Sequence, residues 1–138
     1  MNRYTFDEIV PGQTERFSAT ISAELMEEFR RITGDVNPLH CDDEYARQRG
    51  YKGRVVYGML TSSFYSTLAG VYLPGERALL HSVETKLLKP VFIGDELTIE
   101  GKVAEKHDVF RTIVVKATIT NQLGEKVSRA TIQIGVSE

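Results

Sequence analysis

VVYGMLTSSFYSTLAGVYLPG, residues 55–75, contains no charged residue, and the rest of the architecture depends on what this segment forms. It has about the length that a membrane-spanning helix needs. Serine and threonine side chains and a late proline favour a buried helix of a globular protein instead: Thr61, Ser62, Ser63, Ser66, Thr67 and Pro74. We expect a helix from about Gly58 to Tyr72, roughly 22 Å long. Without a charged face, it should be enclosed by other elements.

Downstream of this helix, apolar residues occur at every second position, which is typical of strands with one buried face. FIGDE and NQLGEK supply turns, and a further strand is expected at about Thr14–Thr20. We therefore predict one domain over residues 1–138, of α+β class, with an antiparallel sheet of about five strands wrapped around a long central helix. The alternating positions are Leu79, Val83 and Leu87; Leu97, Ile99 and Val103; Val109, Ile113, Val115, Ala117 and Ile119; and Ala130, Ile132, Ile134 and Val136.

Upstream, Ser22 is a good N-cap for a helix over about residues 23–33, and Gly34 stands where a left-handed C-cap glycine usually stands. Asp35 then lies just beyond the helix end. Because Pro38 fixes its own φ and favours an extended residue before it, residues 35–40 are predicted to be a structured loop. Asp42 or Asp43 can cap a second, short helix that runs through Arg49.

The composition excludes several classes of protein. The 138 residues are 41% hydrophobic and 26% charged, and the net charge of -2 argues against a general nucleic-acid binder. The single cysteine, Cys41, permits no intramolecular disulfide and is expected to be a small buried residue. The first ten residues, MNRYTFDEIV, contain no apolar signal-peptide core. We expect a cytoplasmic protein that neither spans a membrane nor binds nucleic acid.

The sequence contains no motif that indicates a cofactor or a metal. The chain has no Gly-x-Ser-x-Gly element, no phosphate-binding glycine loop and no dinucleotide fingerprint. HCDD, residues 40–43, contains ligand types, but neighbouring side chains point in different directions and no second cluster completes a set. The basic residues Lys52, Arg54, Lys86 and Lys89 could meet phosphates, although a solvated surface is the commoner role.

Three segments together resemble a known family: DVNPLHCDDEYARQRGYKGRVVYGML, YSTLAGVYLPG and KLLKPVFIGDELTIEGKV. They are similar to the MaoC-like (R)-specific enoyl-CoA hydratases, which have the hot-dog fold, and the resemblance covers about residues 35–103. It implies a homodimer or higher homo-oligomer whose sheets join and whose active sites lie at the subunit interface. It also implies a thioester substrate carried by CoA or by an acyl carrier protein.

The resemblance also assigns roles to individual residues. Asp35 and His40 match the catalytic pair, and Gly58 matches the residue whose backbone N–H polarises the thioester carbonyl. Asn37 and Ser66 match positions that support the site. The chain departs from the family at Tyr57, where a histidine usually precedes Gly-Met, and we expect Tyr57 to be structural.

These residues suit the addition of water to a trans-2-enoyl thioester, a hydro-lyase reaction that also runs backwards as a 3-hydroxyacyl dehydration. Water is a poor nucleophile, so Asp35 would take its proton while His40 holds the same molecule. Negative charge then develops on the thioester oxygen, and a backbone N–H at the amino end of a helix is suited to stabilise it. Having no side chain, Gly58 lets that oxygen come close.

Other interpretations of the same residues stay open. Asp35 and Asn37 could be turn residues alone, and His40 could be a packed imidazole. A hot-dog acyl-CoA thioesterase would bind a similar thioester but would release free thiol. A non-catalytic subunit that binds acyl thioesters, to which Tyr57 would be suited, would show binding without turnover.

Overall fold

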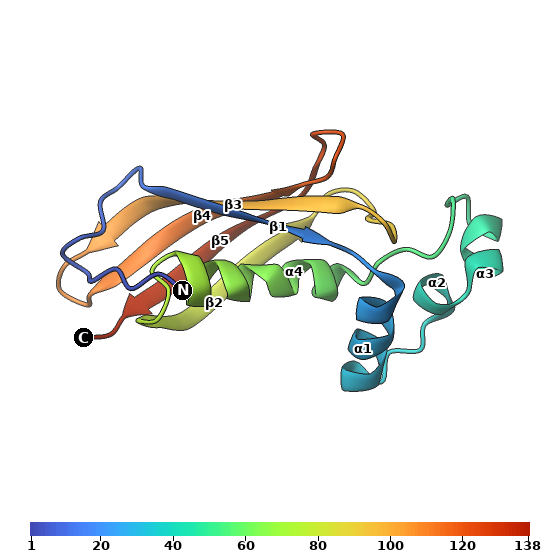
Figure 1. The fold of residues 1–138 in the computed structure, drawn as a ribbon, viewed down its shortest axis with the longest axis horizontal. Helices are drawn as coiled ribbons and strands as arrows, with labels where there is room; N and C mark the ends of the chain where they lie inside the picture. The colour runs from blue at the N-terminus through green and yellow to red at the C-terminus, as the bar shows by residue number, and fades with distance from the viewer.

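The computed structural model describes all residues, 1–138. One antiparallel sheet of five strands in the order β1-β3-β4-β5-β2 forms most of it (Figure 1). The predicted class and sheet are therefore confirmed. The strands are β1 (Thr14–Thr20), β2 (Ala78–Leu87), β3 (Glu96–His107), β4 (Thr112–Thr120) and β5 (Lys126–Val136).

The predicted central helix is α4 (Gly58–Thr67), which continues without a break as a π-helical segment, η1 (Leu68–Tyr72). It lies along one face of the sheet, as Figure 1 shows. The buried Tyr65 hydroxyl donates to Ser128 Oγ of β5 at 2.8 Å, which fixes the helix against the sheet. Gly101 of β3 permits a close approach, because a Cβ there would lie 2.7 Å from Leu68 Cδ2.

The helix α1 (Ala23–Thr33) begins and ends as the sequence predicts. Ser22 Oγ accepts a hydrogen bond from the Leu25 N–H, and Gly34 adopts φ 72° while its N–H donates to the Arg30 carbonyl. Such a left-handed glycine turns the chain sharply at the helix end. Figure 1 shows α1 beyond the end of the sheet, on the side where α4 begins.

The prediction of a loop over residues 35–40 is wrong in its second half, where a four-residue helix, α2 (Pro38–Cys41), forms. Pro38 occupies the first helical position, where its missing N–H costs nothing, and Asn37 Oδ1 caps the turn by accepting from the Leu39 N–H at 2.9 Å. The next short helix, α3 (Asp43–Gln48), follows with Asp42 as its N-cap, close to the expected bounds.

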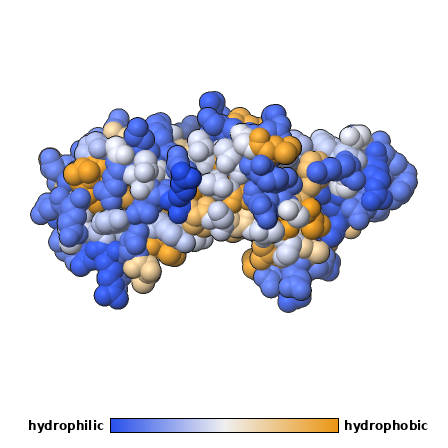
Figure 2. All heavy atoms as spheres, turned by 45° about the horizontal axis from the view of Figure 1, so that its top comes forward, coloured by the Kyte–Doolittle hydropathy of each residue, from blue (hydrophilic) through white to orange (hydrophobic).

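Two expectations about the strands need correction. Val109 does not belong to β4, because the turn between β3 and β4 occupies residues 108–111 and leaves Val109 exposed. The predicted apolar face of β2 is neither continuous nor buried within the chain, since Leu79, Val83 and Leu87 are all exposed. An irregularity between Leu80 and Ser82 places Leu79 on the opposite face from Val83 and Leu87. β2 is an edge strand whose only partner is β5. Figure 2 shows apolar surface in the hollow between the two lobes of the molecule.

No helix in the structure has both the length and the apolar character to cross a membrane.

Candidate active site

A cavity of about 520 Å³ lies between α1, the loop that follows it, the start of α4 and the end of β2. It brings together three of the residues that the sequence singles out, Asp35, His40 and Gly58. A carboxylate, an imidazole and the amino end of a helix thus share one space. The full lining is Phe29, Thr33, Asp35, His40, Tyr57, Gly58, Met59 and Leu87.

Asp35 is held by the turn that ends α1. Its N–H donates to Thr33 Oγ1 at 3.2 Å, and its Oδ1 accepts from the Asn37 N–H at 3.0 Å. Asp35 and Asn37 therefore do form a turn in the backbone, as one of the interpretations of the sequence expects. Because Oδ2 has no partner within the chain, one carboxylate oxygen is left to act on a ligand. Asp35 is exposed to solvent in the single chain.

His40 lies in α2, and its Nδ1 is 2.7 Å from the Val55 carbonyl oxygen. A carbonyl can only accept, so Nδ1 carries the proton in the neutral ring and Nε2 is left as the acceptor. The segment at Val55 is itself fixed, since the Val55 N–H donates to the Leu39 carbonyl at 3.1 Å. This pair of contacts sets both the tautomer and the direction of the imidazole.

Tyr57 connects these two residues. Its hydroxyl donates to the Asp35 carbonyl oxygen at 2.6 Å, while its ring lies 4.3 Å from the His40 ring, centroid to centroid. Phe29 packs on the same ring at 4.8 Å. Burial, together with the neighbouring Cys41 thiol, raises the pKa of Tyr57, so the phenol stays protonated and remains a donor. Tyr57 therefore positions both residues, which agrees with a structural role.

Gly58 is the first residue of α4, and its backbone N–H has no hydrogen-bond partner within the chain. An unpaired N–H at the amino end of a helix attracts negative charge. A side chain at this position would require Leu87 to move, because a Cβ would lie 2.3 Å from Leu87 Cδ1. An oxygen atom that develops negative charge in the cavity could therefore approach this N–H closely.

A second cavity of about 410 Å³ adjoins the first and shares His40, Gly58 and Leu87 with it. It extends past the end of β2 toward residues 88–91 and Val127. Thr61, one turn along α4 from Gly58, also lines it, and its buried hydroxyl has no hydrogen-bond partner. The second cavity thus offers a bound molecule one further polar contact.

The sequence is similar to proteins of one known family. Residues 8–124 match the family described as MaoC like domain. The chain belongs to the MaoC-like family. The family assignment made from the sequence is therefore confirmed.

Two curated relatives share the larger part of this MaoC-like chain. An (R)-specific enoyl-CoA hydratase of Rhodospirillum rubrum is 37% identical over 112 residues, which are 78% of this chain and 78% of that protein. An (R)-specific enoyl-CoA hydratase of Aeromonas caviae is 36% identical over 92 residues, which are 67% of this chain and 69% of that protein.

Solved structures agree on the fold of the MaoC-like chain. The unliganded R-hydratase PhaJ1 of Pseudomonas aeruginosa superposes with a TM-score of 0.91 at 28% identity, over 97% of this chain and 86% of that one. An (R)-hydratase of A. caviae involved in PHA biosynthesis gives 0.89 at 28% identity, over 93% of this chain and 97% of that one. The predicted hot-dog fold is confirmed.

Asn37 and Ser66, the two expected supporting residues, lie outside both cavities of this MaoC-like domain. Asn37 caps α2 and so supports His40 through the backbone. Ser66 is exposed on α4, two turns beyond Gly58, and contacts neither Asp35 nor His40 within the chain. Ser62, on the same face, is buried and donates to the Gly58 carbonyl at 2.9 Å.

One further expectation needs correction. Cys41 is only half-buried, with its sulfur 3.5 Å from the Tyr57 hydroxyl, so its predicted burial is wrong in degree. The structure contains no group of three or more His, Cys, Asp or Glu side chains that could hold a metal ion.

Sequence reasoning missed the apolar walls of the cavities. Phe29 comes from α1 and Met59 from α4, while Leu87 comes from the end of β2. No short motif connects these three residues, and only the folded chain brings them together. The unpaired hydroxyl of Thr61 could not be predicted either, because the burial and the hydrogen bonding of a side chain depend on the folded structure.

Proposed function

We propose that this chain is an (R)-specific enoyl-CoA hydratase, which adds water to a trans-2-enoyl thioester and, in reverse, dehydrates a 3-hydroxyacyl thioester. One observation carries the proposal: Asp35, His40 and the unpaired N–H of Gly58 line the same cavity. Hydration needs these three functions in one place, namely a base, a group that orients water and a donor for the developing oxyanion. The curated relatives bear the corresponding name.

In the proposed mechanism a water molecule lies between the Asp35 carboxylate and His40 Nε2. Both atoms are acceptors, since His40 Nδ1 is occupied by the Val55 carbonyl. As the water oxygen bonds to C3 of the enoyl group, one of its protons leaves to this pair of acceptors. The electron pair of the double bond moves toward the thioester oxygen, where the Gly58 N–H stabilises the charge.

The second half of the addition places a proton on C2. When the electron pair returns from the thioester oxygen, C2 takes a proton from one of the same two groups, and the charge at Gly58 disappears. The protein therefore ends the cycle in its starting protonation state. Dehydration is the same path in reverse, with C2 deprotonated and hydroxide leaving C3 as water.

A second copy of the chain is part of the proposal. Asp35 is exposed in the single chain, whereas a hydration site works best when bulk water is excluded. β2 offers an unpaired edge with exposed apolar side chains, among them Leu79 and Leu80. Such edges usually invite strand pairing with another chain. We propose that two copies join their sheets through β2 and that each closes the cavity of the other.

The direct test is the loss of enoyl absorbance when crotonyl-CoA is mixed with the protein. We expect turnover by the wild type and a decrease in kcat of about a hundredfold or more in Asp35→Asn and in His40→Ala. Asp108→Asn, which removes a carboxylate from an exposed turn outside both cavities, is the matched control and should keep full activity. Wild-type rates in Asp35→Asn and His40→Ala would remove the assigned roles.

The same assay separates the proposal from thioester hydrolysis. A thioesterase releases free CoA, which a thiol reagent detects, and a hydratase leaves the thioester intact. Chromatography of the product on a chiral phase would establish the configuration at C3. We expect the (R) isomer and no free thiol.

A further inference from the structure

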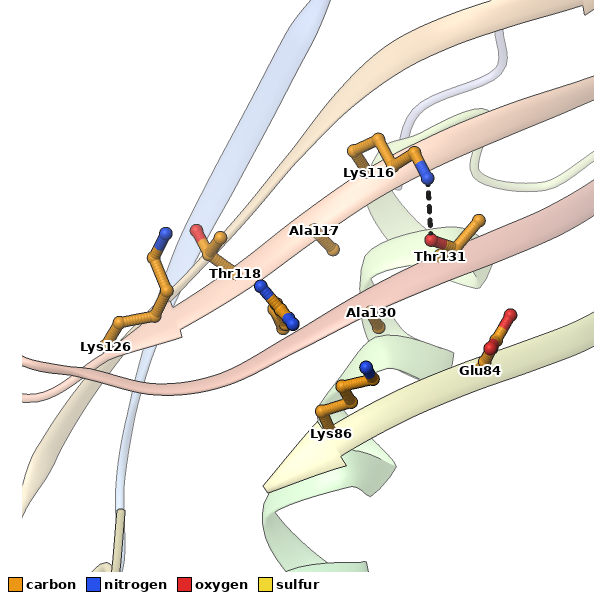
Figure 3. A pocket seen from close by; sticks show the side chains of 9 residues that line it. Glu84, Lys86, Lys116, Ala117, Thr118, Lys126, Ala130 and Thr131 are labelled. Atoms are coloured by element: carbon orange, nitrogen blue, oxygen red, sulfur yellow. Dashed lines mark hydrogen bonds between the residues drawn. The ribbon is translucent and has the colours of Figure 1, made fainter. Parts of the chain in front are cut away.

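Leu87 lies where the two cavities meet. It is the last residue of β2, and only His40 and Gly58 share with it a place in the walls of both cavities. Side chains of successive strand residues point to opposite faces of a sheet. Figure 3 shows Lys86 in front of the sheet, with the helix behind, in a separate groove that also contains Lys116. The side chain of Leu87 therefore points to the other face, toward α4.

The branched end of Leu87 lies directly against the first residue of α4. A Cβ on Gly58 would lie 2.3 Å from Leu87 Cδ1 and 3.4 Å from both Cδ2 and Cγ of the same leucine. The leucine thus fills the space beside the glycine whose backbone N–H is the candidate donor to the thioester oxygen. A thioester held by that N–H lies next to the Leu87 side chain.

The positions of the acid–base residues set the direction of the acyl group at this point. Asp35 lines the first cavity and not the second, so C2 and C3 of the enoyl group, which exchange a proton and water with Asp35 and His40, belong in the first cavity. The thiol arm then leaves the carbonyl carbon toward the second cavity. C2 is the acyl carbon bonded to that carbonyl carbon, and it is therefore the one closest to Gly58 and to Leu87.

We propose that Leu87 determines the specificity of the site by excluding acyl groups that carry a substituent at C2; this inference rests on the proposed function. A hydrogen atom on C2 leaves the leucine in its place, whereas a methyl branch would require it to leave its contact with Gly58. An apolar pocket separates groups that differ by one methylene by about 10- to 200-fold. The substrate class that fits is a trans-2-enoyl thioester that is unbranched at C2.

The test compares crotonyl-CoA with tiglyl-CoA, which has one additional methyl group on C2. The readout is the ratio of kcat/KM for the two substrates, and comparing variants cancels their intrinsic difference in reactivity. In Leu87→Ala we expect the preference for crotonyl-CoA to fall by about tenfold or more. The control Leu88→Ala shortens the neighbouring leucine, which lines the second cavity only, and should leave the ratio unchanged. An unchanged ratio in Leu87→Ala, or an equal change in both variants, would overturn the proposal.

Binding of saturated thioesters keeps this test independent of turnover. Butyryl-CoA and isobutyryl-CoA are isomers that cannot be hydrated, and only the second is branched at C2. Calorimetry should show that the wild type binds butyryl-CoA about tenfold more tightly and that Leu87→Ala loses most of this preference. That result would support the role of Leu87 even if the protein failed to hydrate crotonyl-CoA. Equal affinities of the wild type for the two isomers would overturn it.

Discussion

Tyr57 holds the two candidate catalytic residues through different parts of one side chain. Its hydroxyl fixes the backbone of Asp35, and its ring supports the imidazole of His40. Where the family usually has histidine, this chain thus has a larger residue that packs against both partners and against Phe29. The substitution changes how the site is supported and leaves Asp35, His40 and Gly58 in one cavity.

Replacing Tyr57 by phenylalanine separates these two effects. The ring stays on His40, while the hydrogen bond to the Asp35 carbonyl is lost, so we expect kcat to fall by up to about tenfold with little change in KM. Because the raised pKa keeps the phenol protonated, the shape of the pH–rate profile should not change across neutral pH. Steady-state kinetics of Tyr57→Phe against pH measure both quantities.

Tyr45→Phe is the matched control, since its hydroxyl contacts only Arg49 at the surface. The control should retain wild-type kcat. A wild-type kcat in Tyr57→Phe, or a loss of equal size in Tyr45→Phe, would contradict the positioning role.

Gly58→Ala tests the close approach at the amino end of α4. The new Cβ would meet Leu87 Cδ1 at 2.3 Å and occupy the space next to the free N–H. Leu87 can move because it is exposed, so the fold should survive while kcat/KM falls by about a hundredfold. Gly70→Ala, on the same helical segment with nothing within 4 Å, is the control and should be fully active. Equal activity of the two variants would contradict the role of Gly58.

At the scale of elements, the spacing of apolar residues and the helix-capping residues locate most helices and strands. Ser22 and Gly34 bound α1 as expected, because caps act through contacts within a few residues. The predicted loop over residues 35–40 rests on the limits that Pro38 sets on its own φ and on Asn37, whereas proline at a first helical position favours the helix α2 that forms. The burial of β2 was mispredicted for a different reason. A period of two in the sequence does not show whether another chain covers an apolar face, and it does not reveal the irregularity between Leu80 and Ser82 that moves Leu79 to the opposite face.

The exposed apolar side chains of the edge strand β2 lead to a prediction about assembly. A charge at Leu79, which is 61% exposed, should disrupt pairing through this edge and convert the proposed dimer into a monomer. Light scattering coupled to gel filtration would measure the mass of Leu79→Glu. Val109→Glu, at an equally apolar but more exposed position in the β3–β4 turn, is the control and should remain a dimer. A wild-type chain that is monomeric would contradict the assembly.

The whole molecule is held together by the contact between the central helix and the sheet. Gly101 makes this contact close, since a Cβ there would lie 2.7 Å from Leu68 Cδ2 and 2.9 Å from Val115 Cγ1. Gly101→Ala should therefore lower the free energy of unfolding by about 1–3 kcal/mol through overpacking. Urea denaturation measures this loss. Ala104→Val adds volume at an exposed position of the same strand and should be nearly neutral; equal losses would contradict the explanation.

At the same scale, the candidate site could be predicted only in part. Asp35, His40 and Gly58 can be predicted because the segments that resemble the family contain these residues at the family's spacing. The walls of the cavities could not be identified, because Phe29 and Leu87 meet only after the sheet has formed. The sequence presents Lys86 as a possible phosphate contact, whereas its approach to Lys126 and Arg129 depends on strand register.

Hydration in ¹⁸O-labelled water, followed by mass spectrometry, tests the role of Asp35 and His40 in the reaction without relying on absorbance. With crotonyl-CoA we expect one labelled oxygen at C3 and an intact thioester. Asp35→Asn should form the same product about a hundredfold more slowly. Label in a free carboxylic acid together with released CoA, or equal initial rates of labelling by Asp35→Asn and the wild type, would contradict the hydration mechanism proposed for this site.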